Sequence, residues 1–521
     1  MISRRKFLAV LLVLSTLWLS GGDRVCLAGS AEPRAKYIFL FIGDGMGTGQ
    51  RDAAELYLRL RKGLGSPGGD GLVMNTFPAR ALNTTLGLGG AMPDSASAGT
   101  AIATGFRTGS GVIGMDAEAK KPLESIAETA RKNNRKVGII STVFLTDATP
   151  AAFYAHVPSR KQLHEIALQL VDSGFEYFAG GRIAKSDKNP ADGSGVLERA
   201  RNNGYSVAVG RGEFEALKPG TGKIIAMSSL VDAHGAMYFT LDQAGTGGHI
   251  TLAEYLAKGI ELLDNPNGFF IMAEAGKIDW ACHANDPGAA IHDVLALDEA
   301  VAKAVDFYKK HPDETLIVVT GDHETGGMSL GFSEAGYPMF WESIQNQRMS
   351  FLELTRKLQE YRAGRNAADA NFEDLLALIK EASGFNSPRV ERGALLEAVH
   401  SSTDGQSGDR TGGREPESRD GMALQETELR LLAEAFGGSF VNEQERPGGN
   451  NAYMVYGTFE PLAAITIGIL NKRAGIGWTS YSHTVEPVPT SALGAGAALF
   501  NGSFDQTGIH DRIMKSAGFN R

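Results

Sequence analysis

Three apolar runs that end in acidic residues constrain the fold of this chain more than any other feature. Each has the length and the β-branched or aromatic content of a buried strand: Tyr37 to Ile42, Phe269 to Ala273 and Thr315 to Thr320. Helical patterns, such as those at 251–263 and 289–309, lie between strand candidates. Alternation of strands with helices is typical of α/β folds with parallel pairing. We therefore predict an α/β fold with a large, mostly parallel sheet.

Potential metal ligands occur where these strands end. Asp44 follows the first run in a Gly-rich turn, and Glu274 ends the second run. Asp322 and His323 follow the third run directly. In doubly wound sheets, ligands collect beyond the carboxyl ends of the strands. Any one of these side chains is more often a turn residue than a ligand, but together they predict a metal site at one edge of the sheet.

Helical spacing adds further candidate ligands. If the residues after Lys277 form a helix, Asp279 and His283 are four residues apart and share one helix face, where both can bind one cation. His483 follows a predicted strand at 476–481. A single Asp and His pair of this spacing is more often the start of a capped or salt-linked helix. The agreement of several distant segments favours a metal centre.

The segment Pro93 to Ala101 carries a candidate nucleophile. Its small residues open a predicted helix, and Ser95 is expected at the helix N-terminus, where the helix dipole and free N–H groups favour a phosphate. The alternative is that Asp94 or Ser95 only caps the helix. Ser97 is the rival candidate for the nucleophile.

Residues that follow a predicted strand at 136–142 offer oxygen ligands and a cation. Asp147 and Thr149 have the oxygen atoms that a hard cation such as Mg²⁺ prefers. Arg160 can hold two phosphate oxygens with its planar guanidinium group. Taken singly, each of these residues is more often a turn residue or a surface charge.

The amino terminus has the pattern of an export signal. Arg4, Arg5 and Lys6 precede an apolar run at 7–19, and small residues near Ala28 offer a cleavage site. The adjacent arginines resemble the twin-arginine signal of bacteria, and an ordinary secretory signal is the alternative. The apolar run is shorter than the ~20 residues that span a bilayer. We predict a signal peptide at 1–28, a periplasmic or secreted location, and no membrane attachment after signal removal.

Charge and cysteine content exclude several classes of protein. Removal of residues 1–28 takes away four basic residues and one acidic residue, so the formal net charge falls from −9 to −12. Such an acidic protein is a poor general binder of nucleic acid, and no nucleic-acid partner is expected. Cys26 lies in the signal, which leaves Cys282 alone and excludes an intrachain disulfide.

Composition changes after about residue 330. Residues 331–455 contain a charged helical stretch at 351–382 and a polar, Gly-rich segment at 401–421. We predict that 331–455 is a peripheral insertion with a mobile loop near 401–421. The catalytic α/β domain then consists of residues 36–330 and 456–521.

Taken together, these motifs resemble those of the alkaline phosphatases, in particular the bacterial periplasmic type. The matching segments are GDGMG with Asp44, PDSASAGTA with Ser95, DATP with Thr149, EAGKIDWACH with Glu274, GDHETGG with Asp322, and SHT with His483. They occur in the order found in that family, from about Lys36 to the C-terminus, and residues 331–455 match poorly. The resemblance implies a three-layer α/β/α sandwich.

The resemblance also implies two Zn²⁺ and one Mg²⁺, held by side chains carried over by position. The first zinc set is Asp279, His283 and His483, the second is Asp44, Asp322 and His323, and the magnesium set is Asp44, Thr149 and Glu274. The ligand chemistry agrees, because imidazoles with carboxylates suit zinc and an all-oxygen set suits magnesium. Trp280 departs from the family, in which many relatives carry Lys or His beside the ligand Asp.

The implied activity is hydrolysis of small phosphate monoesters to alcohol and inorganic phosphate, with broad specificity. Ser95 is expected to attack phosphorus while Arg160 holds the phosphoryl group, and a pair of zinc ions is expected to stabilise the attacking and leaving oxygens. Water then hydrolyses the phosphoserine. The family resemblance also makes a homodimer possible. The alternatives are a phosphodiesterase or sulfatase of the same superfamily, or a non-catalytic protein that binds metal or phosphate.

Overall fold

The computed structural model describes residues 34–63, 71–184, 195–245, 247–332, 341–365, 369–387, 422–441 and 452–520. The predicted signal peptide at 1–28 and the predicted mobile loop at 401–421 lie outside these ranges and stay predictions. Within the described ranges, no helix combines the length and the apolar character needed to cross a membrane.

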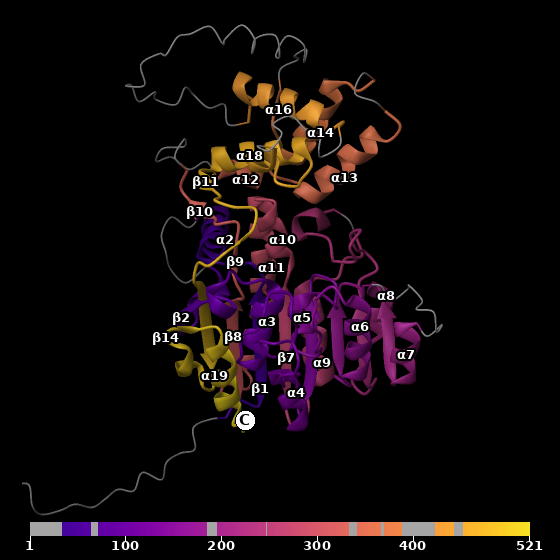
Figure 1. Ribbon diagram of the computed structural model, residues 1–521, viewed down its shortest axis with the longest axis vertical. Coiled ribbons are helices and arrows are strands. Elements are labelled where there is room, and N and C mark those ends of the chain that lie inside the picture. The colour runs from indigo at the N-terminus through magenta and orange to yellow at the C-terminus, as the bar shows by residue number, and fades with distance from the viewer. Residues whose placement is uncertain are drawn as a thin grey trace, which may run out of the picture.

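A ten-stranded sheet runs through the centre of the molecule (Figure 1). Its strands, in order across the sheet, are β14 (Gly502–Asp505), β2 (Ala79–Thr84), β13 (Val488–Gly494), β8 (Thr315–Gly321), β1 (Tyr37–Gly43), β7 (Phe269–Ala275), β3 (Lys136–Ser141), β4 (Tyr177–Gly180), β6 (Lys223–Met227) and β5 (Tyr205–Val209). Neighbouring strands of this sheet are parallel except around β13, which runs antiparallel to β8 and β2. The prediction of a mostly parallel sheet is confirmed.

Helices cover both faces of the sheet, as the side chains of β1 illustrate. Tyr37 and Phe39 pack into the core on one face, and Ile38 and Leu40 pack into the core on the other. Successive side chains of a strand point to opposite faces, so a strand between two helical layers is apolar throughout. The first core contains α2 (Thr48–Arg61), α8 (Arg211–Ala216), α9 (Leu252–Leu263), α10 (Lys277–His283) and α11 (Pro287–Tyr308). The second contains α3 (Ser95–Thr104), α4 (Ile126–Lys132), α5 (Ala148–Ala151), α6 (Leu163–Asp172), α7 (Val196–Asn202) and α19 (Thr507–Ala517). The three-layer α/β/α sandwich is confirmed.

A further group of helices lies above the sheet in Figure 1, over β9 (Glu324–Thr325) and α10. This helical cluster consists of α13 (Phe351–Arg362), α14 (Phe372–Ser383), α16 (Glu426–Gly438), α17 (Ala452–Tyr456) and α18 (Pro461–Ala474). The short α12 (Glu342–Gln345) precedes it. The helices share a core that includes Leu358, Leu375 and Leu470. α18 follows the domain boundary that the sequence predicts at residue 455, yet its apolar face packs into this cluster.

Two predicted elements have different bounds in the structure. The stretch at 351–382 is two helices, because α13 ends before Gly364, which adopts φ 76°, and α14 begins only at Phe372. The predicted strand at 476–481 is limited to β11 (Ile476–Gly477), which pairs with β10 (Ser329–Leu330). The chain then runs to β12 (His483–Thr484), which pairs with β9.

Candidate active site

The register of the central strands brings three carboxylates to one edge of the sheet. Gly43, the last residue of β1, pairs with the last residue of β7 on one side and of β8 on the other. Asp44 and Asp322 therefore stand one residue beyond these paired ends, and Glu274 stands one residue before the end of β7. All three side chains are buried. The predicted gathering of acids at the carboxyl ends of the strands is thus a consequence of in-register parallel pairing.

Helix α10 and strand β12 complete the cluster. α10 starts just after β7, and its spacing puts Asp279 Oδ2 3.4 Å from His283 Nε2. β12 pairs with β9 so that His483 lies opposite Thr325. This pairing holds His483 Nε2 3.5 Å from Asp279 Oδ1 and 3.1 Å from His283 Nε2. The three side chains that the family resemblance assigns to the first zinc therefore lie close together.

Backbone carbonyl groups fix the orientation of two of these imidazoles. His283 Nδ1 lies 2.6 Å from the carbonyl oxygen of Tyr481, and His483 Nδ1 lies 2.8 Å from that of Pro93. A carbonyl oxygen only accepts hydrogen bonds, so each Nδ1 carries the proton and donates it. Each Nε2 then faces the site, where it can bind a metal ion once it carries no proton. This arrangement is typical of metal-binding histidines.

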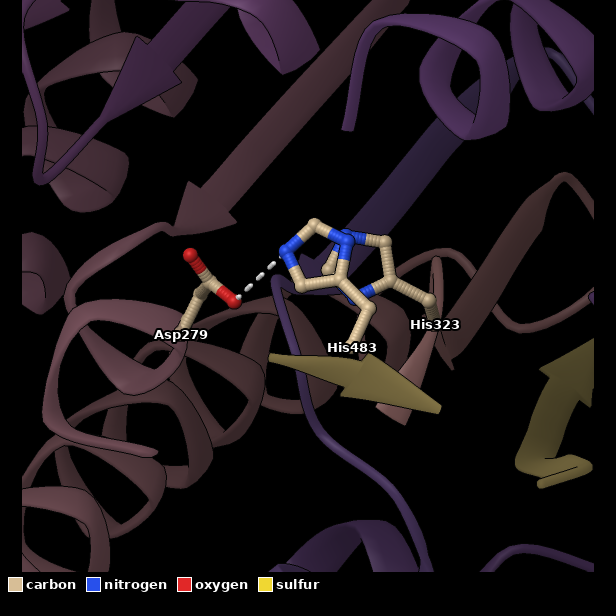
Figure 2. Close-up of side chains that lie close together, drawn as sticks. All are labelled: Asp279, His323 and His483. Atoms are coloured by element: carbon tan, nitrogen blue, oxygen red, sulfur yellow. Dashed lines mark ion pairs between the residues drawn. The ribbon is translucent and has the colours of Figure 1, made fainter. Parts of the chain in front are cut away.

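His323 lies between two groups of potential ligands. Its Nε2 is 3.4 Å from Asp44 Oδ1 and 3.6 Å from Asp322 Oδ2. Its ring stacks on that of His483, with ring centroids 3.8 Å apart. Figure 2 shows the two rings together and Asp279 pointing toward His483. Among the residues that the structure describes, two sets have potential ligand atoms within 4.8 Å of one another: Asp279 with His323 and His483, and Asp44 with Asp322 and His323. His323 is thus close enough to contribute to either ion.

The carboxylates of the site are buried with oxygen atoms that make no hydrogen bond: Asp44 Oδ1, Glu274 Oε1 and Asp322 Oδ2. Burial, together with repulsion between the neighbouring acids, raises the pKa of Asp44 and of Glu274 well above their usual values, and raises that of Asp322 to about 7. Unpaired buried carboxylates are costly. A divalent cation removes this cost by stabilising the ionised forms, so the residues present fit the metal ions that the family resemblance implies.

The imidazoles have the opposite effect on Asp279. Burial favours the neutral acid, but His283 and His483 are close enough to lower the pKa of Asp279. In turn, Asp279 raises the pKa of His283 to about 9 against the effect of burial. Burial and the nearby His483 lower the pKa of His323 well below its usual value, so His323 is a neutral ring with a lone pair to donate.

The predicted third set is also assembled. Thr149 Oγ1 donates a hydrogen bond to Asp44 Oδ2 at 3.3 Å, and the hydroxyl of Ser141 donates to Glu274 Oε2. Thr149 is held in place because Asp147 caps α5 by accepting from the N–H of Ala148. The carboxylate and hydroxyl oxygens of this group are the ligand type that Mg²⁺ prefers.

The N-terminus of α3 distinguishes the two candidate serines. Asp94 caps the helix, and Ser97 closes a capping box in which its hydroxyl and N–H both bond to Asp94. The hydroxyl of Ser97 is therefore engaged in a structural hydrogen bond. Ser95 is the first helical residue, is 4% exposed, and has its Oγ 3.4 Å from His323 Nε2. Of the two serines, only Ser95 faces the candidate metal ligands.

Arg160 is held by two carboxylates beside the site. Its Nη1 lies 3.3 Å from Asp94 Oδ2, and its Nη2 lies 3.0 Å from Asp147 Oδ1. Although burial opposes its charge, Asp147 and Asp94 raise the pKa of Arg160. The Arg160 side chain is about one third exposed, so its guanidinium group is positioned and charged while the side chain stays accessible to a phosphate. Asp147 thus acts on Arg160 and caps α5.

Two functional residues were not singled out from the sequence. Thr325 Oγ1 donates to Asp279 Oδ1 at 2.6 Å and contacts His323 Nδ1 at 3.2 Å, so it links the two ligand sets. Glu324 accepts from Gln50 Nε2 and from the hydroxyl of Thr484, which fastens β9 to β12. Both lie inside the GDHETGG motif, so their place beside His323 is the signal that could have identified them.

A family model described as alkaline phosphatase matches residues 35–176 and 184–376. The chain belongs to the alkaline phosphatase family. The match includes residues 331–376, so the prediction that 331–455 matches the family poorly is wrong for that part, and the match ends before His483. Alkaline phosphatase 4 of Bacillus subtilis is 27% identical over 81% of this chain and 77% of its own length.

Solved structures agree on the fold. A cold-active alkaline phosphatase from Shewanella sp. aligns with a TM-score of 0.71 and 23% identity, over 92% of this chain and 99% of its own. A mutant of the TAB5 alkaline phosphatase with Mg bound in the M3 site aligns with a TM-score of 0.59 and 22% identity, over 94% of this chain and 100% of its own.

As a member of the alkaline phosphatase family, the protein is a phosphoric monoester hydrolase. It releases alcohol and inorganic phosphate in the metal-dependent reaction, through a phosphoserine, that is general to the family. Metal binding agrees with the two clusters of ligand atoms at the carboxyl edge of the sheet.

Proposed function

We propose that Ser95 is the nucleophile of a broad-specificity phosphomonoesterase. The observation that carries this proposal is the position of Ser95, which opens α3 and has its Oγ 3.4 Å from His323 Nε2. Ser95 Oγ attacks phosphorus, the bond from phosphorus to the alcohol oxygen breaks, and the alcohol leaves with a proton. Water then attacks the phosphoserine, which releases inorganic phosphate and restores the hydroxyl.

The proposed metal content is two Zn²⁺ and one Mg²⁺. The proposed holders are Asp279, His283 and His483 for one zinc, Asp44, Asp322 and His323 for the other, and Asp44, Thr149 and Glu274 for magnesium. When bound, the zinc ions would stabilise negative charge on the oxygens that attack and leave phosphorus. Magnesium in the M3 site of the TAB5 mutant enzyme supports the third assignment. Elemental analysis of protein purified without added metal tests the content.

Arg160 is the proposed binding group for the transferred phosphoryl. Its contacts with Asp94 and Asp147 hold the planar guanidinium in one orientation, and its exposed edge can donate two parallel hydrogen bonds to phosphate oxygens. This preorganisation lowers the entropy that is lost when phosphate binds.

Replacement of Ser95 tests the nucleophile. We expect Ser95→Ala to lose at least about a thousandfold in kcat while its zinc content stays near that of the wild type, because the metal ligands are unchanged. Ser97→Ala is the matched control, since the hydroxyl of Ser97 only bonds to Asp94 in the capping box of α3. It should keep its activity and lose about 1 kcal/mol of stability. Full activity in Ser95→Ala would show that another group attacks phosphorus.

The reaction class is tested on one purified sample. We expect turnover of a phosphate monoester to exceed that of a phosphate diester and of a sulfate ester. Dominance of the diester or the sulfate ester would favour a phosphodiesterase or sulfatase instead. Absence of all three activities after zinc and magnesium are restored would favour a non-catalytic binding protein.

Location and assembly are further parts of the proposal. The arginine pair and apolar run of residues 1–28 support export to the periplasm or medium by the twin-arginine route. Sequencing the N-terminus of the exported protein tests cleavage near Ala28, and replacing both arginines with lysine should abolish export by this route. Light scattering of the purified protein tests the homodimer.

A further inference from the structure

A pocket of about 440 Å³ opens between the metal centre and the helical cluster. α10 contributes Trp280 and His283 to its wall, α13 contributes Phe351 and Arg362, and Phe459 comes from the segment before α18. Its volume lies within the ~300–1,000 Å³ range of small-molecule sites. None of these wall residues except His283 has a part in the proposed chemistry of phosphate.

His283 connects the pocket with the reacting centre. Its Nε2 faces Asp279 and His483, while one third of its side chain is exposed and lines the pocket. Ser95 approaches from the other end of the cluster, where it contacts His323. An in-line displacement puts the leaving oxygen on the side of phosphorus opposite to the nucleophile. If Ser95 is the nucleophile, as the proposed function has it, the alcohol part of the ester extends past His283 into this pocket.

The walls of the pocket suit an aromatic or bulky apolar group. Phe351 and Phe459 meet edge to face, with ring centroids 5.3 Å apart and an interplanar angle of 78°. Together with Trp280 they form an aromatic wall. An aromatic ring of a ligand can pack against this wall by stacking or by edge-to-face contacts. Arg362, paired with Glu460 at 3.0 Å, makes one part of the wall polar.

Trp280 is held rigidly by a buried ion pair. Lys277 Nζ is fully buried, donates to Asp232 Oδ2 at 2.8 Å, and lies 4.4 Å from the centre of the Trp280 ring. Asp232 also accepts from the N–H of His234, whose ring packs edge to face on Trp280 at 5.6 Å. The indole is therefore fixed from two sides before any substrate arrives. A fixed wall loses little conformational entropy when a ligand binds.

We propose that this pocket binds the alcohol part of aryl and bulky apolar phosphate monoesters, and that Trp280 and Phe459 give the enzyme a preference for such esters. Trp280, the most visible departure from the family pattern, is then a specificity residue. The inference rests on the proposed function, because it takes Ser95 as the nucleophile.

Two esters that differ only in the alcohol test the preference in the metal-loaded enzyme. In Trp280→Ala and in Phe459→Ala, we expect kcat/KM for phenyl phosphate to fall about tenfold, the factor that corresponds to ~1.4 kcal/mol of lost apolar burial. For methyl phosphate, kcat/KM should change by less than about threefold. Phe106→Ala is the control, because Phe106 is 50% exposed beyond the end of α3 and does not line the pocket. Equal losses on both esters, or no loss on either, would overturn the proposal.

A binding measurement separates this proposal from the proposed function. We expect the wild type to bind phenylphosphonate about tenfold more tightly than methylphosphonate by calorimetry, and Trp280→Ala to bind the two equally. Equal affinities in the wild type would overturn the pocket assignment even if both esters are hydrolysed. If neither ester is hydrolysed but phenylphosphonate is preferred, the pocket assignment stands and the proposed function fails.

Discussion

Replacement of Thr325 by Val removes one hydroxyl group from the centre of the candidate metal site and keeps the size of the side chain. The hydroxyl has one proton, which it donates to Asp279 Oδ1 at 2.6 Å. Its oxygen can then accept from His323 Nδ1 at 3.2 Å. That bond puts the proton of His323 on Nδ1 and leaves Nε2 free to face Asp44 and Asp322. The Val variant loses both bonds at once.

The size of the effect follows from burial and charge. Thr325 is fully buried and its acceptor is a carboxylate. A hydrogen bond to a charged group contributes about 1.5–3 kcal/mol. Every ~1.4 kcal/mol is a factor of ten, so we expect metal affinity to fall about 10- to 100-fold. Loss of the hydrogen-bond partners of metal ligands has effects of the same size. With excess zinc, kcat should recover to within about tenfold of the wild type.

A chelator titration measures this effect. The chelator concentration that removes half of the activity should fall at least about tenfold in Thr325→Val. Thr466→Val is the matched control, because Thr466 is also buried but its hydroxyl donates only to the carbonyl of Leu462 within α18. If Thr325→Val loses half of its activity at the same chelator concentration as the wild type and Thr466→Val, the Thr325 hydroxyl does not orient Asp279 and His323. Our description of the site would then be wrong.

Three further outcomes follow from the structure. Asp94→Asn keeps the cap of α3 but removes one of the two negative charges that hold Arg160. We therefore expect KM and the inhibition constant for phosphate to rise about three- to tenfold. An unchanged inhibition constant for phosphate would contradict this role of Asp94. Burial lowers the pKa of His156, but Glu128 at 3.0 Å raises it more. The resulting stabilisation is complete below pH ~6.5 and is lost as pH rises through the folded pKa. His156→Gln should therefore lower the free energy of unfolding by up to about 1 kcal/mol at pH 6, and by less at pH 9; equal losses at both pH values in urea titrations would refute the pairing. Phe39→Ala leaves a cavity in the fully buried centre of β1, so it should lower the free energy of unfolding by about 3–5 kcal/mol in the same urea titrations. A decrease below about 1 kcal/mol would contradict the tight packing of this core.

Local patterns in the sequence were sufficient for the central strands of the sheet and for the acidic residues that follow them. The runs Thr315 to Thr320 and Tyr37 to Ile42 are β8 and β1, each with one residue added at its end. Alternation with helices predicted parallel pairing, which the register confirms. The four-residue spacing of Asp279 and His283 predicted a shared helix face, and α10 provides it. These inferences succeeded because they depend on neighbours within a few residues.

Other features required the arrangement of distant segments. The sequence could not separate Ser95 from Ser97 by local chemistry, because both open the same helix. The difference arises from His323, 228 positions away, which lies beside Ser95 alone. Likewise, the helix α18 is an ordinary apolar run in the sequence, and only its packing against α16 assigns it to the helical cluster.

The sequence by itself determined which side chains are available for chemistry and at which strand ends they stand, because strand and helix periods are local properties of the chain. The tertiary structure decided that His323 lies between two sets of candidate ligands, that carbonyl groups orient His283 and His483, and that Trp280 and Phe459 line the same pocket. Those distances depend on strand order, register and the packing of α10 beneath the helical cluster. Such contacts join residues up to several hundred positions apart, and no local pattern encodes them.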